Sequence, residues 1–224
     1  MYLLGIDDAG RGPLIGPMFL AGVLIKSSEE KALKELGATD SKLLYQKERV
    51  KIAKEIRKIS KVCLVESPPE EIDDAVIGGA NLNNLEAKKA ADIINSLNDK
   101  KEKIKVIVDC PSINTLAWKN KLISFIEYKE NLDIKCEHKA DFNHPVVGAA
   151  SIIAKVAREE AVSEIKKKFG NIGSGYPSDP ITIKFIKLKG KQLENTGIVR
   201  KSWSTWRKLY PISNKNSQSS LKEF

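Results

Sequence analysis

Aspartates that follow apolar runs are the residues of this chain best placed for chemistry. Asp7 and Asp8 end one apolar run, Asp109 follows another, and Asp141 precedes the longest predicted helix. Parallel strands bring their carboxyl ends to the same edge of a sheet, so we expect these carboxylates to meet there. Four carboxylates with no Lys or Arg between them repel one another, and divalent cations would remove that repulsion.

The predicted site offers oxygen ligands only. No Cys or His framework accompanies the acids, which favours Mg²⁺ or Mn²⁺ over zinc. Two such ions about 4 Å apart can activate a water and stabilise the leaving oxygen of a phosphodiester, so we predict a two-ion site. Adjacent residues of a regular strand point to opposite faces. Asp7 and Asp8 are therefore expected to share the site only if the strand bulges or ends there, which Gly10 would permit.

Other interpretations of the ionisable groups stay open. A single Asp at a strand end is often only a turn former. His138 and His144 would instead suggest general acid and base cleavage of RNA. Further paired acids lie in a polar stretch that we expect to be solvated between helices; they are Glu70, Glu71, Asp73 and Asp74.

The elements that would position these groups alternate along the chain. Short β-rich runs predict strands at residues 2–7, 19–25, 62–65, 105–108 and 133–137. Apolar residues at helical spacing predict helices at residues 47–59, 81–97, 114–128 and 145–169. This order predicts an α/β fold whose sheet begins with an antiparallel pair, continues with parallel strands and is flanked by helices.

Length and charge limit the kind of protein. The 224 residues predict one full domain and a smaller appendage. Lys and Arg outnumber Asp and Glu by 38 to 29, a net charge of +9 that favours a polyanionic partner. The excess is concentrated between residues 184 and 208, where Glu194 is the one acid among eight basic residues. The basic residues are Lys184, Lys187, Lys189, Lys191, Arg200, Lys201, Arg207 and Lys208. This patch predicts salt-sensitive affinity for a duplex backbone, while Trp203 and Trp206 are expected to be core anchors.

Nothing in the sequence indicates a membrane or secreted protein. No apolar run approaches the roughly 20 residues of a membrane span. The three cysteines, Cys63, Cys110 and Cys136, are odd in number and far apart, which fits neither a disulfide framework nor a zinc site. We therefore expect a cytoplasmic monomer with no membrane partner.

Five blocks of sequence resemble the ribonuclease HII family, and specifically its archaeal members. They occur in family order over residues 3–206. The blocks are Gly5-Ile-Asp-Asp-Ala-Gly-Arg-Gly-Pro13, Asp40-Ser-Lys42, Val108-Asp-Cys-Pro-Ser112, His138-Lys-Ala-Asp141 with the helix Pro145 to Arg158, and Gly173-Ser-Gly-Tyr-Pro-Ser-Asp-Pro180. The resemblance implies a ribonuclease H-like mixed sheet flanked by helices, with a small helical C-terminal domain. It also implies an endonuclease that hydrolyses the RNA strand of RNA/DNA hybrids or nicks at ribonucleotides embedded in DNA.

The resemblance also implies roles for individual residues. Asp7, Asp8, Asp109 and Asp141 match the metal-binding catalytic acids, although the family usually has Glu at the position of Asp8. The loop of Gly10, Arg11 and Gly12 resembles one whose backbone reads a 2′-hydroxyl, the group that distinguishes RNA from DNA. Tyr176 is similar to a tyrosine that packs against the sugar, and Lys42 to a lysine that contacts phosphate. Lys155 and Arg158 could face phosphate or form a solvated helix face.

The end of the chain carries a separate signal. Gln218, Leu221 and Phe224 resemble a sliding-clamp-binding peptide, with a chance match at a frayed terminus as the alternative. The predicted organisation is a catalytic domain at residues 1–172, a basic helical domain at 173–212 and a flexible tail at 213–224. Two other functions remain: a ribonuclease H-like DNA nuclease, and a non-catalytic, clamp-tethered nucleic-acid-binding protein.

Overall fold

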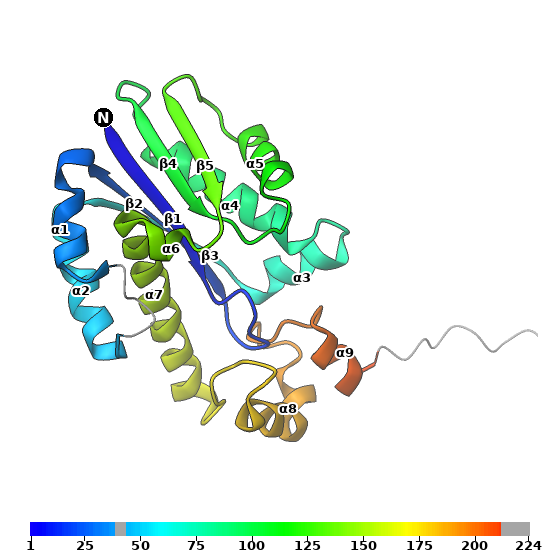
Figure 1. The fold of residues 1–224 in the computed structure, drawn as a ribbon. Helices are drawn as coiled ribbons and strands as arrows, with labels where there is room; N and C mark the ends of the chain where they lie inside the picture. Colours follow the sequence, from blue (N-terminus) through cyan, green and yellow to red (C-terminus); the bar gives the residue numbers. More distant parts are fainter. Residues whose placement is uncertain (39–43, 212–224) are drawn as a thin grey trace, which may run out of the picture.

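A five-stranded mixed sheet forms the centre of the computed structural model, which describes residues 1–38 and 44–211 (Figure 1). The strands lie in the order β3-β2-β1-β4-β5. Their bounds are β1 Tyr2–Ala9, β2 Met18–Lys26, β3 Lys61–Ser67, β4 Ile104–Asp109 and β5 Leu132–Glu137. All five predicted strands are confirmed, each extended by one to three residues at one or both ends.

Both kinds of strand pairing are present, as the order of elements predicted. β1 pairs antiparallel with β2, and β2 pairs antiparallel with β3. β4 lies parallel to β1, and β5 lies parallel to β4. The carboxyl ends of β1, β4 and β5 therefore meet at one edge of the sheet, which is where α/β sheets place their ligands.

Helices cover both faces of the sheet (Figure 1). One apolar cluster packs α7 and the helices α1 and α2 against one face, and a second packs α4 and α5 against the other. The helical bounds are η1 Ser27–Glu29, α1 Glu30–Glu35, α2 Gln46–Ile59, α3 Pro69–Ile77, α4 Leu82–Leu97, α5 Thr115–Ser124, α6 Ala140–Asn143, α7 Pro145–Phe169, α8 Pro180–Leu193 and α9 Ser204–Leu209. The helix expected at residues 114–128 ends earlier, at Ser124.

Glycine lets the first turn of α7 approach β1 closely. A Cβ atom added at Gly5 would lie 2.3 Å from the carbonyl oxygen of Val146. Gly148 meets the carbonyl oxygen of Ala38 in the same way, at 2.2 Å from an added Cβ. Atoms at these separations overlap, so only glycine fits without a backbone shift. The close packing brings the start of α7 next to the strand that carries Asp7 and Asp8.

A third apolar cluster joins the C-terminal helices to the loop that follows β1. Leu14 and Ile15 of that loop are fully buried and belong to one cluster with the buried Phe185 of α8 and Trp206 of α9. Figure 1 shows α8 and α9 beyond the end of β1, beside this loop. The division into domains at residues 172/173 stays a prediction. In the described part of the chain, no helix is both long and apolar enough to cross a bilayer.

The second acidic cluster does not lie in a solvated linker as expected. Glu70, Glu71, Asp73 and Asp74 all belong to helix α3. Asp73 is only 5% exposed, and it accepts hydrogen bonds from the backbone of Lys201 and Ser202. The expectation of solvation was wrong for Asp73, because it shares the inward side of α3 with Ile72; Glu70 and Asp74 are exposed as expected.

Candidate active site

Asp7 and Asp8 lie near the carboxyl end of β1, and the sheet that contains this strand is packed between two layers of helices. The strand neither bulges nor ends between them, because their pairing with Ala21 and Leu20 of β2 is continuous. Of the two conditions for a shared site, the bulge is absent, and the strand ends at Ala9, one residue after Asp8. The described pairing of β1 with β4 stops at Ile6 and Val108, one residue before Asp7. Both carboxylates thus lie beside the open edge that the end of β4 leaves.

Asp7 has a partner in α7, and Asp8 interacts with charged residues of both helical layers, Glu86 of α4 and Lys155 of α7. Asp7, which is 6% exposed, accepts a hydrogen bond from the amide of Asp8 at 2.8 Å and bonds to Ser151 of α7. Asp8 interacts electrostatically with Glu86 of α4. Asp7, Asp8 and Asp109 nevertheless line one small pocket together with Glu86. Three of the four predicted acids are therefore gathered at the carboxyl edge of the sheet.

Asp109 ties the fourth acid to this edge through the backbone. Its Oδ1 accepts a hydrogen bond from the amide of Ala140 at 2.8 Å. Ala140 begins the short helix α6, whose second residue is Asp141, 6% exposed. Lys139, in the left-handed conformation at φ 58°, makes the turn from β5 into α6. Asp141 is therefore the residue directly after Ala140, whose amide Asp109 binds.

Burial makes negative charge unfavourable in this site. Burial raises the pKa of Asp7 well above its ordinary value, and repulsion from Asp8 and Asp109 adds to the effect. Burial and repulsion from Glu86 raise the pKa of Asp8 to about 7, although Arg11 and Lys155 act in the opposite direction. Close carboxylates in a desolvated site favour protons or cations as counter-charges.

The donor set fits a hard divalent cation, but its members are not gathered into a finished cage. The acids of the pocket offer carboxylate oxygen alone, the ligand type of Mg²⁺ and Mn²⁺. Among residues 1–38 and 44–211, no three His, Cys, Asp or Glu side chains already converge as a ligand set. Two of the acids accept hydrogen bonds from backbone amides instead: Asp7 from Asp8, and Asp109 from Ala140. Side-chain rotation would have to bring the oxygens together.

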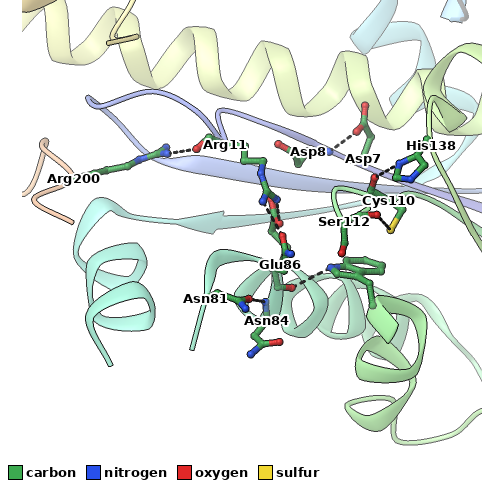
Figure 2. A network of polar contacts seen from close by, with 12 residues as sticks. Asp7, Asp8, Arg11, Asn81, Asn84, Glu86, Cys110, Ser112, His138 and Arg200 are labelled. Carbon is green, nitrogen blue, oxygen red and sulfur yellow. Dashed lines mark hydrogen bonds and ion pairs between the residues drawn. The ribbon is translucent and has the colours of Figure 1, made fainter. Parts of the chain in front are cut away.

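Glu86 belongs to this site although the sequence analysis did not single it out. Its side chain is 2% exposed and pairs with the guanidinium of Arg11, which also donates to Asn83 Oδ1 at 2.8 Å (Figure 2). Burial raises the pKa of Glu86 to about 7, against the opposing effect of Arg11. A signal was present in the sequence, because Glu86 falls four residues after Leu82 and four before Ala90, on the apolar side of α4.

An open cleft of about 450 Å³ begins at Asp8. Its lining includes the predicted substrate-binding residues Gly10, Arg11, Gly12, Lys155, Arg158 and Tyr176, and also Arg49 and Glu159, which were not predicted. The guanidinium of Arg158 lies 5.1 Å from the centre of the Tyr176 ring, and it donates to the carbonyl of Ser174 at 3.1 Å. The side chains of Arg49 and Glu159 form an ion pair. A cationic cleft thus leads directly to the acids.

Comparison with known proteins decides the family. The family model described as Ribonuclease HII matches residues 4–206. The chain belongs to the ribonuclease HII family. It is 42% identical over 210 residues to the ribonuclease HII of Methanococcus maripaludis, covering 92% of this chain and 86% of the relative. Members of this family are metal-dependent endoribonucleases, so the chain is a hydrolase that cleaves RNA.

Solved ribonuclease HII structures share the fold. Ribonuclease H2 from Pyrococcus horikoshii OT3 superposes with a TM-score of 0.84 at 34% identity, over 93% of this chain and 97% of that one. A ribonuclease HII from Archaeoglobus fulgidus, solved in a complex with PCNA, gives a TM-score of 0.79 at 38% identity, over 91% and 95% of the two chains. The predicted ribonuclease H-like mixed sheet flanked by helices is confirmed.

The histidines that suggested an alternative chemistry each have a partner within the protein. His138 Nδ1 lies 3.0 Å from the carbonyl oxygen of Cys110, and His144 Nε2 lies 2.5 Å from Glu137 Oε1. His138 thus bonds to the residue that follows β4, and His144 to the last residue of β5. Lys42 and the tail residues Gln218, Leu221 and Phe224 lie outside the described residues.

Arg200 corrects the prediction of a basic surface patch. It was counted in the predicted basic patch, yet its side chain is fully buried, whereas the other seven basic residues of that patch are exposed. Of the two tryptophans expected to be core anchors, Trp206 is 5% exposed, whereas Trp203 is partly exposed and bonds to Gly12. Charge in a sequence therefore does not locate the duplex-binding surface by itself.

Proposed function

We propose that this ribonuclease hydrolyses the RNA strand of RNA/DNA hybrids and nicks duplex DNA on the 5′ side of embedded ribonucleotides. The products are a 5′-phosphate and a 3′-hydroxyl. One observation carries the proposal: Asp7, Asp8 and Asp109 line a small pocket that shares Asp8 with a cationic cleft, and the loop of Gly10, Arg11 and Gly12 lines that cleft. A nucleic-acid strand in the cleft can thus bring its phosphate to the acids and its ribose to the loop.

The acids are proposed to hold two Mg²⁺ or Mn²⁺ ions. Asp7, Asp8, Asp109 and Asp141 are the ligands, and the bound ions supply an activated water and charge stabilisation at the leaving oxygen. The protein's own part is to keep these carboxylates desolvated, so that cations become their favoured counter-charges. Asp8 is one methylene shorter than the Glu that the family usually has there, so the reach of this ligand differs.

The remaining cleft residues are proposed to bind the substrate. The loop amides approach the 2′-hydroxyl, and the exposed ring of Tyr176 packs against the sugar. Lys155 and Arg158 neutralise phosphates, with Lys42 as a further contact. The position of the loop, Tyr176, Lys155 and Arg158 in one cleft with Asp8 supports their roles, whereas Lys42 lies outside the described residues.

The tail and the setting of the enzyme are also proposals. Gln218, Leu221 and Phe224 are proposed to bind a sliding clamp, an idea supported by the complex with PCNA solved for the Archaeoglobus relative. The enzyme would act as a monomer in the cytoplasm during replication and repair. The free cysteines fit such a reducing compartment.

A labelled DNA duplex with one internal ribonucleotide tests the activity. Wild type, Asp7→Asn and the control Asp133→Asn are incubated with Mg²⁺, Mn²⁺ or a chelator, and an all-DNA duplex and an RNA/DNA hybrid are run beside them. Asp133 is exposed on β5, away from the pocket, which makes it a matched substitution. We expect a metal-dependent nick 5′ of the ribonucleotide, lost in Asp7→Asn and kept in Asp133→Asn.

The same experiment separates the alternatives. Cleavage of the all-DNA duplex would favour a DNA nuclease, and metal-independent cleavage with a 2′,3′-cyclic end would favour the histidines. Duplex binding without any nick would favour a non-catalytic binder. Each of these results contradicts the proposed function.

A further inference from the structure

Arg200 is a buried cation that points into the loop after β1. Its side chain is fully buried, and it donates three hydrogen bonds to backbone carbonyls of that loop. Nη2 donates to Gly10 at 2.5 Å, Nη1 to Arg11 at 2.7 Å and Nε to Gly16 at 3.0 Å. Burial lowers the pKa of Arg200 to about 9, which leaves it charged at neutral pH. Charged donors make stronger hydrogen bonds than neutral ones.

Trp203 completes the set of contacts to the loop. Its indole Nε1 donates to the carbonyl of Gly12 at 3.0 Å. The ring also lies under the guanidinium of Arg200, 4.8 Å from ring centre to Cζ. Together the two side chains bind the carbonyls of all three residues of the Gly10–Gly12 loop, from a segment about 190 residues later in the chain.

The segment that carries these side chains is itself fixed on both sides. Ile15 and Val199 form an antiparallel bridge, and the amide of Arg200 donates to the carbonyl of Leu14 at 2.9 Å. Asp73 of α3 then accepts from the amide of Lys201 at 2.7 Å and from the amide of Ser202 at 2.8 Å. A rigid support of this kind can hold a loop geometry against thermal motion.

The planarity of the peptide bond converts these carbonyl contacts into an orientation of amides. In a trans peptide, the C=O of one residue and the N–H of the next point in opposite directions. Arg200 binds the carbonyls of Gly10 and Arg11, so it directs the N–H groups of Arg11 and Gly12 away from itself. The carbonyl of Gly12 precedes Pro13, which has no N–H. Arg11 and Gly12 both line the cleft, where Tyr176 lies next to Gly12.

We propose that Arg200, with Trp203, is a positioning residue that presents the amides of Arg11 and Gly12 to the ribose of the substrate. This inference rests on the proposed role of the loop and adds the residues that set it. Neither side chain has to touch the substrate. Their effect is on discrimination between a ribonucleotide and a deoxyribonucleotide, beyond any effect on stability.

Duplex binding in the presence of a chelator tests this without catalysis. The measured quantity is the ratio of dissociation constants for an all-DNA duplex and for the same duplex with one ribonucleotide. Arg200→Lys keeps the charge but not the three-donor fork, and Trp203→Phe keeps the ring but not the N–H. We expect each to lower the ratio by roughly five-fold, the effect of about one hydrogen bond, while binding of all-DNA duplex changes less than two-fold.

The matched control is Trp206→Phe, which alters a buried aromatic of the same segment that packs on Tyr210 and not on the loop. Thermal midpoints are measured for every variant. A merely structural role would lower the midpoints and leave all the ratios alike, and that result overturns the proposal. Trp203→Phe keeps the test decisive if Arg200→Lys fails to fold.

The outcomes also distinguish this inference from the proposed function. A wild-type ratio of one overturns the inference, because the loop then confers no preference to be lost. Metal-dependent nicking at the ribonucleotide by the same preparation would still uphold the proposed function. Variants that keep the wild-type ratio overturn the inference alone.

Discussion

Arg11 and Glu86 form an ion pair that joins the loop after β1 to helix α4 (Figure 2). Arg11 is held twice, through its carbonyl by Arg200 and through its guanidinium by Glu86 and Asn83. The carboxylate of Glu86 also repels that of Asp8, in the direction that raises the pKa of Asp8. One side chain therefore links the position of the loop to the charge state of the acids.

Glu86→Gln removes this charge while keeping the shape of the side chain. The pKa of Asp8 should fall, because the repulsion disappears and Arg11 is left to interact with Asp8. We expect the acidic limb of the profile of kcat/KM against pH to move toward lower pH. Arg11 is 35% exposed and burial already disfavours the charged form of Glu86, so we expect the free energy of unfolding at neutral pH to change by less than about 1 kcal/mol.

Glu164→Gln is the control for that shift, since Glu164 forms an exposed ion pair with Lys167 on α7. Its profile should match that of wild type. An unchanged acidic limb in Glu86→Gln would show that Glu86 does not influence the essential carboxylates.

Asp8 should make the metal-free enzyme less stable as pH rises. Its pKa in the folded protein is about 7, against 3.8 as the ordinary value, so the unfolded chain loses this proton first. The stabilising contribution of the protonated group is complete below about pH 4, is lost as pH rises toward 7, and is absent above. We expect Asp8→Asn to remove this loss. The difference in unfolding free energy, variant minus wild type, should therefore rise by roughly 2 kcal/mol from pH 5 to pH 8.

Denaturant unfolding in the presence of a chelator, at pH 5 and at pH 8, measures the difference in unfolding free energy between wild type and Asp8→Asn. Added Mn²⁺ should restore the stability of wild type at pH 8 more than at pH 5, because a bound cation favours the ionised carboxylates. A wild-type and Asp8→Asn difference that does not vary with pH would mean that Asp8 is ionised throughout.

The sequence was sufficient for the parts of this molecule that follow local rules. Short β-rich runs predicted the five strands, and apolar residues at helical spacing predicted the bounds of α7 correctly. Asp7, Asp8 and Asp109 could be placed at one edge because parallel strands share a direction, and the structure gathers them in one pocket. The convergence of Asp141 and the ligand roles of all four stay predictions.

The supporting residues could not be found in the same way, because their partners are distant in the chain. Asp73, Glu86 and Arg200 are charged, and a charge in isolation indicates solvent. Asp73 follows Pro69 by four residues and precedes Val76 by three, so it interrupts the apolar face of α3. Glu86 interrupts the apolar face of α4 in the same way. A charged residue on an apolar helix face is the signal that would have found them. For Arg200, between Val199 and Lys201, no such periodic signal exists.

Tyr176 should contribute through its ring and not through its hydroxyl. The ring is 39% exposed, lies over Arg158 and borders Gly12. We expect Tyr176→Ala to lower kcat/KM on a single-ribonucleotide duplex about ten-fold, as the loss of one stacking contact would. Tyr176→Phe should stay within about three-fold of wild type. Tyr128→Ala, at a half-buried tyrosine after α5, serves as the control. Equal losses in the Phe and Ala variants would assign the effect to the hydroxyl.

Gly10→Ala should disturb the loop by crowding as well as by backbone strain. Gly10 has φ +92°, which side-chain-bearing residues rarely adopt. An added Cβ would also lie 2.7 Å from Cδ of Arg158 and 2.8 Å from the carbonyl oxygen of Pro17. Gly37 shares the positive φ, at +79°, but has nothing within 4 Å of an added Cβ. Gly37→Ala therefore isolates the strain alone, about 1 kcal/mol of unfolding free energy.

We expect Gly10→Ala to exceed that loss by at least about 1 kcal/mol, because the Pro17 carbonyl belongs to the backbone and cannot move aside like a side chain. Cleavage should fall further than stability, since the displaced Arg158 and the loop amides both face the cleft. Denaturant unfolding and single-turnover cleavage of both variants separate the two effects. If Gly10→Ala and Gly37→Ala lose the same stability and Gly10→Ala cleaves normally, then close packing of Arg158 on the loop has no part in substrate recognition.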